Sequence, residues 1–483
     1  MDKGIDRMNG LVNEIVGFVL GPAQGMEIGE VERGLLKLVM RVGKEGLVCY
    51  LEEKGTGRQG NEIVSPTGEP LPYVRDRKRL YRSIFGPIEI KRAYYHATGS
   101  PGRCPLDSDI NLPEKGYSYL LQEFSSKLAV NGSYEKSCDV LGDIFPLRLP
   151  IRSLEQIVGD AREDVARYYD RKPTPESSEQ AVITVATIDR KGVVIRKPPS
   201  EEAVVKATPS DPLKPGKKKM STVASAYNIK RHMRTADQVA REIKGEEPLP
   251  DKPKPEAKEV WGSVTESVEQ VMLRLKAAVD KRLKAAQELV CILDGERGLW
   301  RLVCKYFPTA FFVLDIFHVL EHLAEAAHCF YEEKTPEARK FVTERLKMLL
   351  TGEVGRLIGG LKQIVSKRKL SKGRKYRLNK VIGYLERNKE HMRYDQCLEK
   401  GYPIGSGVIE GACRNLINDR LELTGMRWIL QGAESVIRLR AVFINKDWAD
   451  FWRFRRRSER DRLYGSSKET GMDLHEQELP QAA

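Results

Sequence analysis

Between residues 181 and 314, strand-like and helix-like segments follow one another in an order that constrains the fold more than any other feature of the chain. The apolar runs AVITVATI, STVASAYNI, ELVCILD and AFFVLD are short and rich in β-branched residues, as buried strands are. The turn-like sequence DRKG separates AVITVATI from a further strand, VVIRK, and helical segments precede and follow ELVCILD. Three strands followed by helix, strand, helix and strand predict an RNase H-like mixed sheet, an α/β core with helices covering its faces.

The regions outside these strands differ in pattern. IFGPIEIKRAYYH predicts a strand after a loop-rich stretch, and residues 116 to 170 predict three short helices, the second capped by Ser133. Such helices are typical of a helix-turn-helix reader of DNA or of a plain three-helix bundle. A polar insertion, 198–219, has a composition typical of disorder, and the proline-rich stretch 245–259 predicts a linker.

These patterns divide the chain into six regions. They are an N-terminal helical and β region at 1–111, a helix-turn-helix-like DNA-binding domain at 112–178, the first part of the core at 179–330, a basic helical insertion at 331–400, the final core helices with Glu410 at 401–446, and a basic C-terminal tail at 447–483.

The charge of the chain favours a polyanionic partner. Lys and Arg number 82 against 68 Asp and Glu, a net charge of +14, and the segment 362–380 has nine basic and no acidic residues. Nucleic acid is the partner that such a charge favours first. The eight cysteines form no CxxC pair and are typical of reduced cytosolic thiols, and no apolar run reaches the ~20 residues of a membrane span. We therefore expect a soluble intracellular protein without a membrane segment.

Three acidic residues stand out at the ends of these elements. Asp189 follows the strand ITVATI, although DRKG also fits a type I turn. Asp294 follows ELVCIL at the strand end where α/β sheets bind ligands. Glu410 lies in the first turn of the helix GVIEGACRNLINDRLE, where it could instead favour the helix dipole and pair with Arg414. Together the three acids would supply hard oxygen ligands for two Mg²⁺ (or Mn²⁺) ions roughly 4 Å apart that act on a phosphodiester.

The segment HVLEH, from His318 to His322, supports a different class of enzyme. It matches the H-x-x-E-H signature, in which two histidines on one helical face bind zinc beside a glutamate base. A zinc metallopeptidase would leave the strand-end aspartates and the basic excess unexplained, and the sequence shows no third zinc ligand. The histidines could also lie on the polar side of an ordinary amphipathic helix.

Several blocks of this sequence resemble the ISKra-type insertion-sequence transposases, a bacterial and archaeal DDE group related in plan to the Mutator-like transposases. The blocks are IFGPIEIKRAYY with the following CPLD, KKKMSTVASAYNI, ILDGERGLWRLVCKYFPTAFFVLDIFHVLEHL, PIGSGVIEGACRNLINDRLELTGMRWILQGAESVIRLR and NKDWADFW. The resemblance implies an RNase H-like core interrupted by a helical insertion, with Asp189, Asp294 and Glu410 as the DDE triad.

The same resemblance implies roles for other residues. DIFH, Asp315 to His318, is similar to a D-x-x-H element that such transposases carry after the second aspartate, which assigns His318 to support of the catalytic site. Arg427 and Trp428 of GMRW would lie near the transposon end and bind DNA.

The expected function is therefore that of a DNA transposase. It would bind the terminal inverted repeats of its element, hydrolyse phosphodiester bonds at the element ends, and transfer the freed 3′-OH to target DNA by two-metal catalysis. Because two DNA ends must be held together, a homodimer or larger homo-oligomer is expected, in the prokaryotic cytoplasm and associated with the nucleoid. The alternatives are the zinc metallopeptidase and a catalytically inactive DNA-binding protein.

Overall fold

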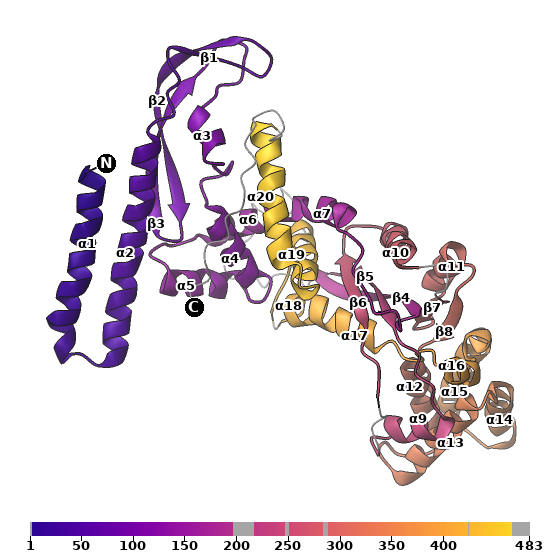
Figure 1. The fold of residues 1–483 in the computed structure, drawn as a ribbon. Helices are drawn as coiled ribbons and strands as arrows, with labels where there is room; N and C mark the ends of the chain where they lie inside the picture. The colour runs from indigo at the N-terminus through magenta and orange to yellow at the C-terminus, as the bar shows by residue number, and fades with distance from the viewer. Residues whose placement is uncertain (1, 197–216, 247–250, 284–287, 424, 466–483) are drawn as a thin grey trace, which may run out of the picture. The chain divides into compact units, whose positions relative to one another are not determined.

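The computed structural model of the chain describes residues 2–196, 217–246, 251–283, 288–423 and 425–465. It divides into two compact units, which are described separately: Met1–Asp170 with Lys446–Ala483, and Arg171–Asn445. Figure 1 shows the elements of both units. All eight cysteines are free, as the sequence predicts. Within the described residues, no helix has the length and apolar character needed to cross a membrane.

The first unit begins with two long helices and a small sheet. Helices α1 (Asp2–Leu20) and α2 (Ile28–Lys54) form a hairpin around the short helix η1 (Pro22–Gly25), and Arg41 pairs with Glu14 across it at 2.5 Å. Strands β1 (Glu62–Val64), β2 (Pro70–Ser83) and β3 (Gly86–Tyr95) form an antiparallel sheet in that order. The predicted strand is β3. Its partner β2 was not predicted, because VRDRKRLYRS is charged and largely exposed and shows no alternation of apolar and polar residues.

The rest of the first unit is helical. It contains α3 (Pro105–Asp109), α4 (Tyr119–Ala129), α5 (Tyr134–Ile144), α6 (Ile151–Glu163), α7 (Val165–Arg171) and α20 (Trp448–Tyr464). Helices α4, α5 and α6 contact one another, and the Ser133 hydroxyl accepts the Lys136 N–H at 3.2 Å, which confirms the predicted cap. Helix α20 occupies part of the expected basic tail and is helical because Phe451 and Trp452 are buried and Arg455 pairs with Asp164.

The second unit is built on a five-stranded mixed sheet. Its strands are β4 (Ile183–Ile195), β5 (Lys217–Ile229), β6 (Glu256–Ser263), β7 (Glu288–Leu293) and β8 (Phe311–Leu314), in the spatial order β6-β5-β4-β7-β8. The pairs β4–β5 and β5–β6 are antiparallel, whereas β4–β7 and β7–β8 are parallel. This is the arrangement of an RNase H-like sheet, so the predicted fold class is confirmed.

Two local predictions within the sheet were wrong. DRKG is not a turn: β4 continues through it, because Asp189 pairs with Val223 and Gly192 with Met220 along an unbroken ladder. The expected linker 245–259 is also partly wrong, because its end belongs to β6, whose Glu259 pairs with Ala226. The polar insertion expected at 198–219 lies outside the described residues up to residue 216.

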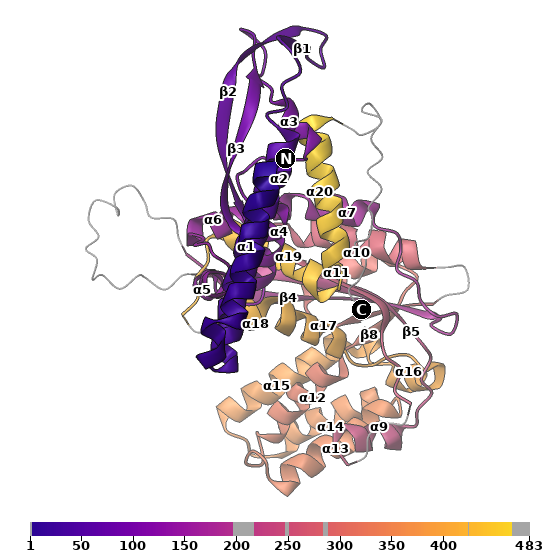
Figure 2. The same cartoon turned by 60° about the vertical axis from the view of Figure 1, so that its left-hand side comes forward.

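Helices surround this sheet and extend from it. They are α9 (Ala236–Ile243), α10 (Val268–Arg282), α11 (Arg297–Tyr306) and α12 (Ile316–Ala327), then α13 (Pro336–Leu350), α14 (Val354–Lys367), α15 (Lys372–Arg387), η2 (Lys389–His391) and α16 (Tyr394–Lys400), and last α17 (Gly407–Cys413), the π-helical turn η3 (Arg414–Asn418), α18 (Asp419–Leu421) and α19 (Leu430–Ile444). Figure 2 shows α12 to α15 gathered with α9 on one side of the sheet. Helix α19 is held to β6, since the Asn445 amide bonds the N–H and the carbonyl oxygen of Val260, each at 2.9 Å.

Candidate active site

The parallel strands bring the two predicted aspartates to one edge of the sheet. Thr187 of β4 pairs with Ile292 of β7, and Asp189 and Asp294 each lie two residues further along. Because parallel strands run side by side in register, the two residues lie at neighbouring positions: Asp189 is within β4, just past its pairing with β7, and Asp294 directly follows β7. The carboxyl end of such strands is where open α/β sheets bind their ligands.

Strand β8 adds a third aspartate that the sequence analysis did not count as a ligand. Asp315 directly follows β8, and its N–H donates to the Leu293 carbonyl oxygen at 2.8 Å, which places it beside Asp294. Its side chain is fully buried. One carboxylate oxygen accepts the Phe317 N–H at 3.0 Å as the N-cap of α12, and the other accepts the Ser406 hydroxyl. The buried charge is thus held by hydrogen bonds from two separate segments.

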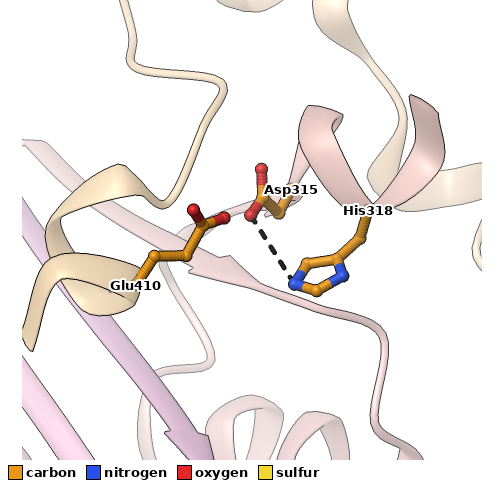
Figure 3. Close-up of side chains that lie close together, drawn as sticks. All are labelled: Asp315, His318 and Glu410. Carbon is orange, nitrogen blue, oxygen red and sulfur yellow. Dashed lines mark ion pairs between the residues drawn. The ribbon is translucent and has the colours of Figure 1, made fainter. Parts of the chain in front are cut away.

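Asp315, His318 and Glu410 form a cluster that could hold a cation (Figure 3). One ligand atom from each lies within 4.8 Å of the others, and His318 Nε2 is 4.0 Å from Asp315 Oδ2. Within the described ranges, no other three His, Cys, Asp or Glu side chains meet this spacing. Glu410 is exposed and reaches the cluster from the first turn of α17.

Asp189 and Asp294 lie outside this group of three, and Asp294 interacts electrostatically with its His318. Burial raises the pKa of Asp294, the Glu296 N–H bonded to it at 3.0 Å lowers that pKa, and the charge of Asp189 raises it again; His318 lowers it. Asp189 in turn accepts the Cys413 thiol at 3.4 Å. Asp294 is therefore the residue that links the cluster to Asp189, because its pKa responds to both Asp189 and His318.

Helix α17 contacts both Asp189 and the Asp315–His318–Glu410 cluster. Cys413 lies three residues after Glu410, so both project from the same face of the helix, one toward Asp189 and the other toward Asp315. Burial and the negative charge of Asp315 raise the pKa of Glu410, and His318 lowers it. Arg414, considered above as the helical partner of Glu410, instead has its Nε 3.7 Å from Asp419 Oδ1.

Two tyrosines of the helical insertion hydrogen-bond to the backbone at the ends of β7 and β8. The Tyr384 hydroxyl on α15 donates to the Asp294 carbonyl oxygen at 2.8 Å, and the Tyr384 ring lies 3.9 Å from that of His322. The Tyr394 hydroxyl at the start of α16 donates to the Leu314 carbonyl oxygen, also at 2.8 Å. Both hydrogen bonds fix strand ends that carry an aspartate, so the insertion stabilises the geometry of the site.

The two histidines of HVLEH have separate surroundings. His318 belongs to the acidic cluster, with its Nδ1 3.3 Å from Glu321 Oε2. His322 Nδ1 lies 3.1 Å from Glu325 Oε2 and its ring packs on Tyr384. In the part of the chain that the structure describes, no third ligand joins both histidines. Nothing in this geometry favours the zinc peptidase.

The two residues of GMRW differ in exposure. Trp428 is 7% exposed; its indole N–H donates to the Leu421 carbonyl oxygen at 3.1 Å, and its backbone forms a bridge with Ile195 at the end of β4. Arg427 is exposed. The buried indole of Trp428 stabilises the fold, whereas Arg427 is accessible to solvent. That both residues bind DNA stays a prediction.

The sequence reasoning placed Asp315 in the D-x-x-H element without weighing it as a ligand, and it missed Ser406 altogether. The signal for Asp315 was present, because AFFVLD ends in an aspartate as ELVCILD does. Ser406 had no such signal: a serine before a helix is an ordinary N-cap candidate, and only the fold shows that its hydroxyl meets Asp315.

Comparisons with known proteins add little to this description. No family model matches the chain, and no curated protein matches its sequence. Among solved structures, it is similar to the Drosophila P element transposase strand transfer complex, with 10% sequence identity over 74% of this chain and 85% of that chain and a TM-score of 0.24. So low a TM-score adds nothing to the strand order and register described above.

Proposed function

We propose that this protein is a DDE-type DNA transposase of the ISKra kind. It binds the terminal inverted repeats of its element, hydrolyses phosphodiester bonds at the element ends and transfers the 3′-OH to target DNA. The observation that carries the proposal is the placement of Asp189 and Asp294 on neighbouring parallel strands of an RNase H-like sheet, with the Asp315–His318–Glu410 cluster beginning at the end of the next strand. The net charge of +14 supports a polyanionic substrate.

The donor set fits two divalent cations of the Mg²⁺ or Mn²⁺ type. Carboxylate oxygens are the ligands that these hard ions prefer, and Asp189, Asp294 and Glu410 would supply them from three different elements. The pKa values of Asp294 and Glu410 are raised partly by neighbouring carboxylates, which is the repulsion that bound cations would relieve. When bound, such ions activate a water or 3′-hydroxyl and stabilise the leaving oxygen.

The other residues of the site have positioning roles in this proposal. Ser406 and the Phe317 N–H hold the Asp315 carboxylate in place, and Tyr384 holds the backbone of Asp294. His318 lies on the other side of Asp315 from Glu410, with a ligand atom within 4.8 Å of one on each acid, so its imidazole can help to orient the two carboxylates. Aligning the acids before DNA arrives lowers the cost of assembling the reactive geometry.

A basic surface on the insertion is the proposed path for the DNA backbone. The nine Lys and Arg residues of 362–380, at the end of α14 and along α15, are all exposed, together with Tyr376. Helix α15 is tied to Asp294 by Tyr384, so this surface has a fixed relation to the acidic site. Phosphate contacts from such a surface position a duplex without reading its sequence.

The test is cleavage of labelled duplexes carrying the terminal repeats of the element, in the presence of Mg²⁺. Glu410→Gln should retain DNA binding and lose cleavage by ~10³-fold or more, because metal-assisted charge stabilisation supplies several kcal/mol and each ~1.4 kcal/mol is tenfold in rate. Glu325→Gln, which removes an exposed carboxylate further along α12, is the matched control and should cleave normally. Undiminished cleavage by Glu410→Gln would disprove the assignment. Binding without cleavage by the wild type would favour the inactive DNA-binding alternative.

A further inference from the structure

A cavity of about 360 Å³ opens beside the acidic site, within the unit Arg171–Asn445. Its volume lies in the ~300–1,000 Å³ range of small-molecule pockets. Two of its lining residues, Ile316 and Phe317, directly follow Asp315, and Val408 lies two residues before Glu410. The cavity therefore shares its wall with the segments that present the candidate ligands, although the side chains that line it have no role in the mechanism above.

The walls of this cavity are mainly apolar. Ile229 at the end of β5, Ile243 of α9 and Ile404 contribute aliphatic surface. Phe317 contributes an aromatic ring that remains 44% exposed, which is high for a phenylalanine lining a cavity. A Cβ at Gly405 would lie only 2.6 Å from Phe317 Cε2, so the glycine makes room for the ring at this place. The result is an aromatic surface beside an apolar pocket.

The lining also carries positive charge and an unused donor. Lys230, Arg234 and Lys252 line the cavity against a single carboxylate, Glu242, which pairs with Lys252 at 2.9 Å. The Arg234 guanidinium donates to the Tyr402 carbonyl oxygen, but its Nε is buried with no acceptor among the described residues. Burial of this guanidinium lowers its pKa. A ligand that brings a hydrogen-bond acceptor and an attached anion would match both features.

We propose that this cavity receives one unstacked nucleobase of the DNA strand next to the phosphodiester that the acidic site cleaves; the inference rests on the proposed function. A base has two flat apolar faces for Phe317 and the aliphatic walls, acceptor atoms on its edge for Arg234, and flanking phosphates for the cationic residues. An aliphatic ligand would use the walls alone and leave the charges unmatched. Extruding a base beside the scissile bond bends the strand, which brings the phosphate toward the carboxylates.

The experiment compares intact DNA with DNA that lacks the base. Terminal-repeat duplexes are prepared intact or with a single abasic nucleotide at each position flanking the cleaved bond, and affinity is measured by fluorescence anisotropy without divalent ions. Ile243→Trp fills the cavity from α9, the wall that carries none of the candidate ligands. It should bind intact DNA ~5- to 100-fold more weakly than the wild type, since a base stacked on an aromatic contributes that much, and should match the wild type on the duplex abasic at the extruded position.

Two further variants complete the test. Phe317→Ala should show the same loss on intact DNA and the same recovery on abasic DNA, which guards against a folding defect of the tryptophan variant. Leu273→Trp adds the same ring at an exposed position of α10 outside the cavity and should bind both duplexes as the wild type does.

The outcomes separate the inference from the proposed function. If Ile243→Trp and Phe317→Ala bind every duplex as the wild type does while the wild type cleaves DNA, the base pocket is overturned and the transposase function stands. If the two variants recover on abasic DNA but the wild type never cleaves, the pocket stands and the proposed catalysis fails. If the wild type binds none of the duplexes, both are overturned.

Discussion

At the scale of single residues, the raised pKa of Asp294 predicts a pH-dependent cost to the folded protein. Burial and the charge of Asp189 raise this pKa above the unfolded value of about 3.9, so ionisation is penalised only in the folded state. The free energy of unfolding therefore falls as pH rises from about 4 through the folded pKa, and the loss is complete above it. Asp294→Asn should melt higher than the wild type at pH 7 without divalent ions, and this gain should vanish near pH 4.

The size of this effect can be bounded and measured. If the penalty is ~1 kcal/mol, the gain is about 2–4 °C for a unit of this size. Thermal melts between pH 4 and pH 8 in a chelator test it, and added Mg²⁺ should raise the melting temperature of the wild type more than that of Asp294→Asn. If the melting temperatures of the two proteins differ by the same amount at pH 4 and pH 7, the destabilisation does not come from ionisation of Asp294.

Ser406 makes a second prediction at this scale. Its hydroxyl donates to the buried Asp315 carboxylate, so Ser406→Ala removes a hydrogen bond from a charge that water does not reach. We expect unfolding to become easier by ~1–3 kcal/mol and cleavage to slow while DNA binding is unchanged. Ser435→Ala, at another buried serine whose hydroxyl bonds the Gln431 carbonyl oxygen within α19, should cost less. Denaturant unfolding and cleavage rates of the two variants show whether the loss comes from the Ser406–Asp315 hydrogen bond or from removing any buried serine hydroxyl.

At the scale of elements, the apolar runs predicted β4, β5, β7 and β8, because buried strands are marked by their own composition. The strands that were missed are β1, β2 and β6. Each is short, charged or proline-flanked and exists because a neighbouring strand pairs with it. The same limit applied to the site. Asp189 was judged against a turn that β5 removes, and Asp315 was not weighed because its role depends on the register of β8 with β7. The sequence shows which residue types could bind a metal, but it does not show which strands pair and so which of these residues lie together.

The basic surface of α14 and α15 predicts how DNA binding depends on salt. Each phosphate contact releases counterions, so the slope of log K against log [salt] measures the number of contacts. Arg374→Gln with Arg377→Gln should weaken binding to any DNA sequence and reduce the slope by about 1.8, that is ~0.9 for each lost contact. Lys276→Gln with Lys305→Gln removes the same charge from α10 and α11, where both lysines pair with acids, and should leave the slope unchanged. Equal slopes for both double variants would place the DNA elsewhere.

At the scale of the whole molecule, one chain supplies every member of the candidate site. The acids come from the middle of β4, the ends of β7 and β8, and α17, all within Arg171–Asn445. Each copy therefore carries every member of the candidate site, and under the proposed function two copies would be needed only because two DNA ends would be joined together. This separates two activities that an assembly would show: cleavage of one end needs one active copy, and concerted joining of both ends needs two.

Mixing active and inactive copies tests this division of labour. When wild type is mixed with Asp294→Ala at constant total protein, single-end cleavage should fall in proportion to the wild-type fraction, whereas concerted joining should fall with its square, as expected for a symmetric pair. Glu325→Gln in place of Asp294→Ala should leave both activities unchanged, because its site is complete. Joining that declines only in proportion would mean that one copy processes both ends, and a steeper decline than the square would require more than two copies in the active assembly.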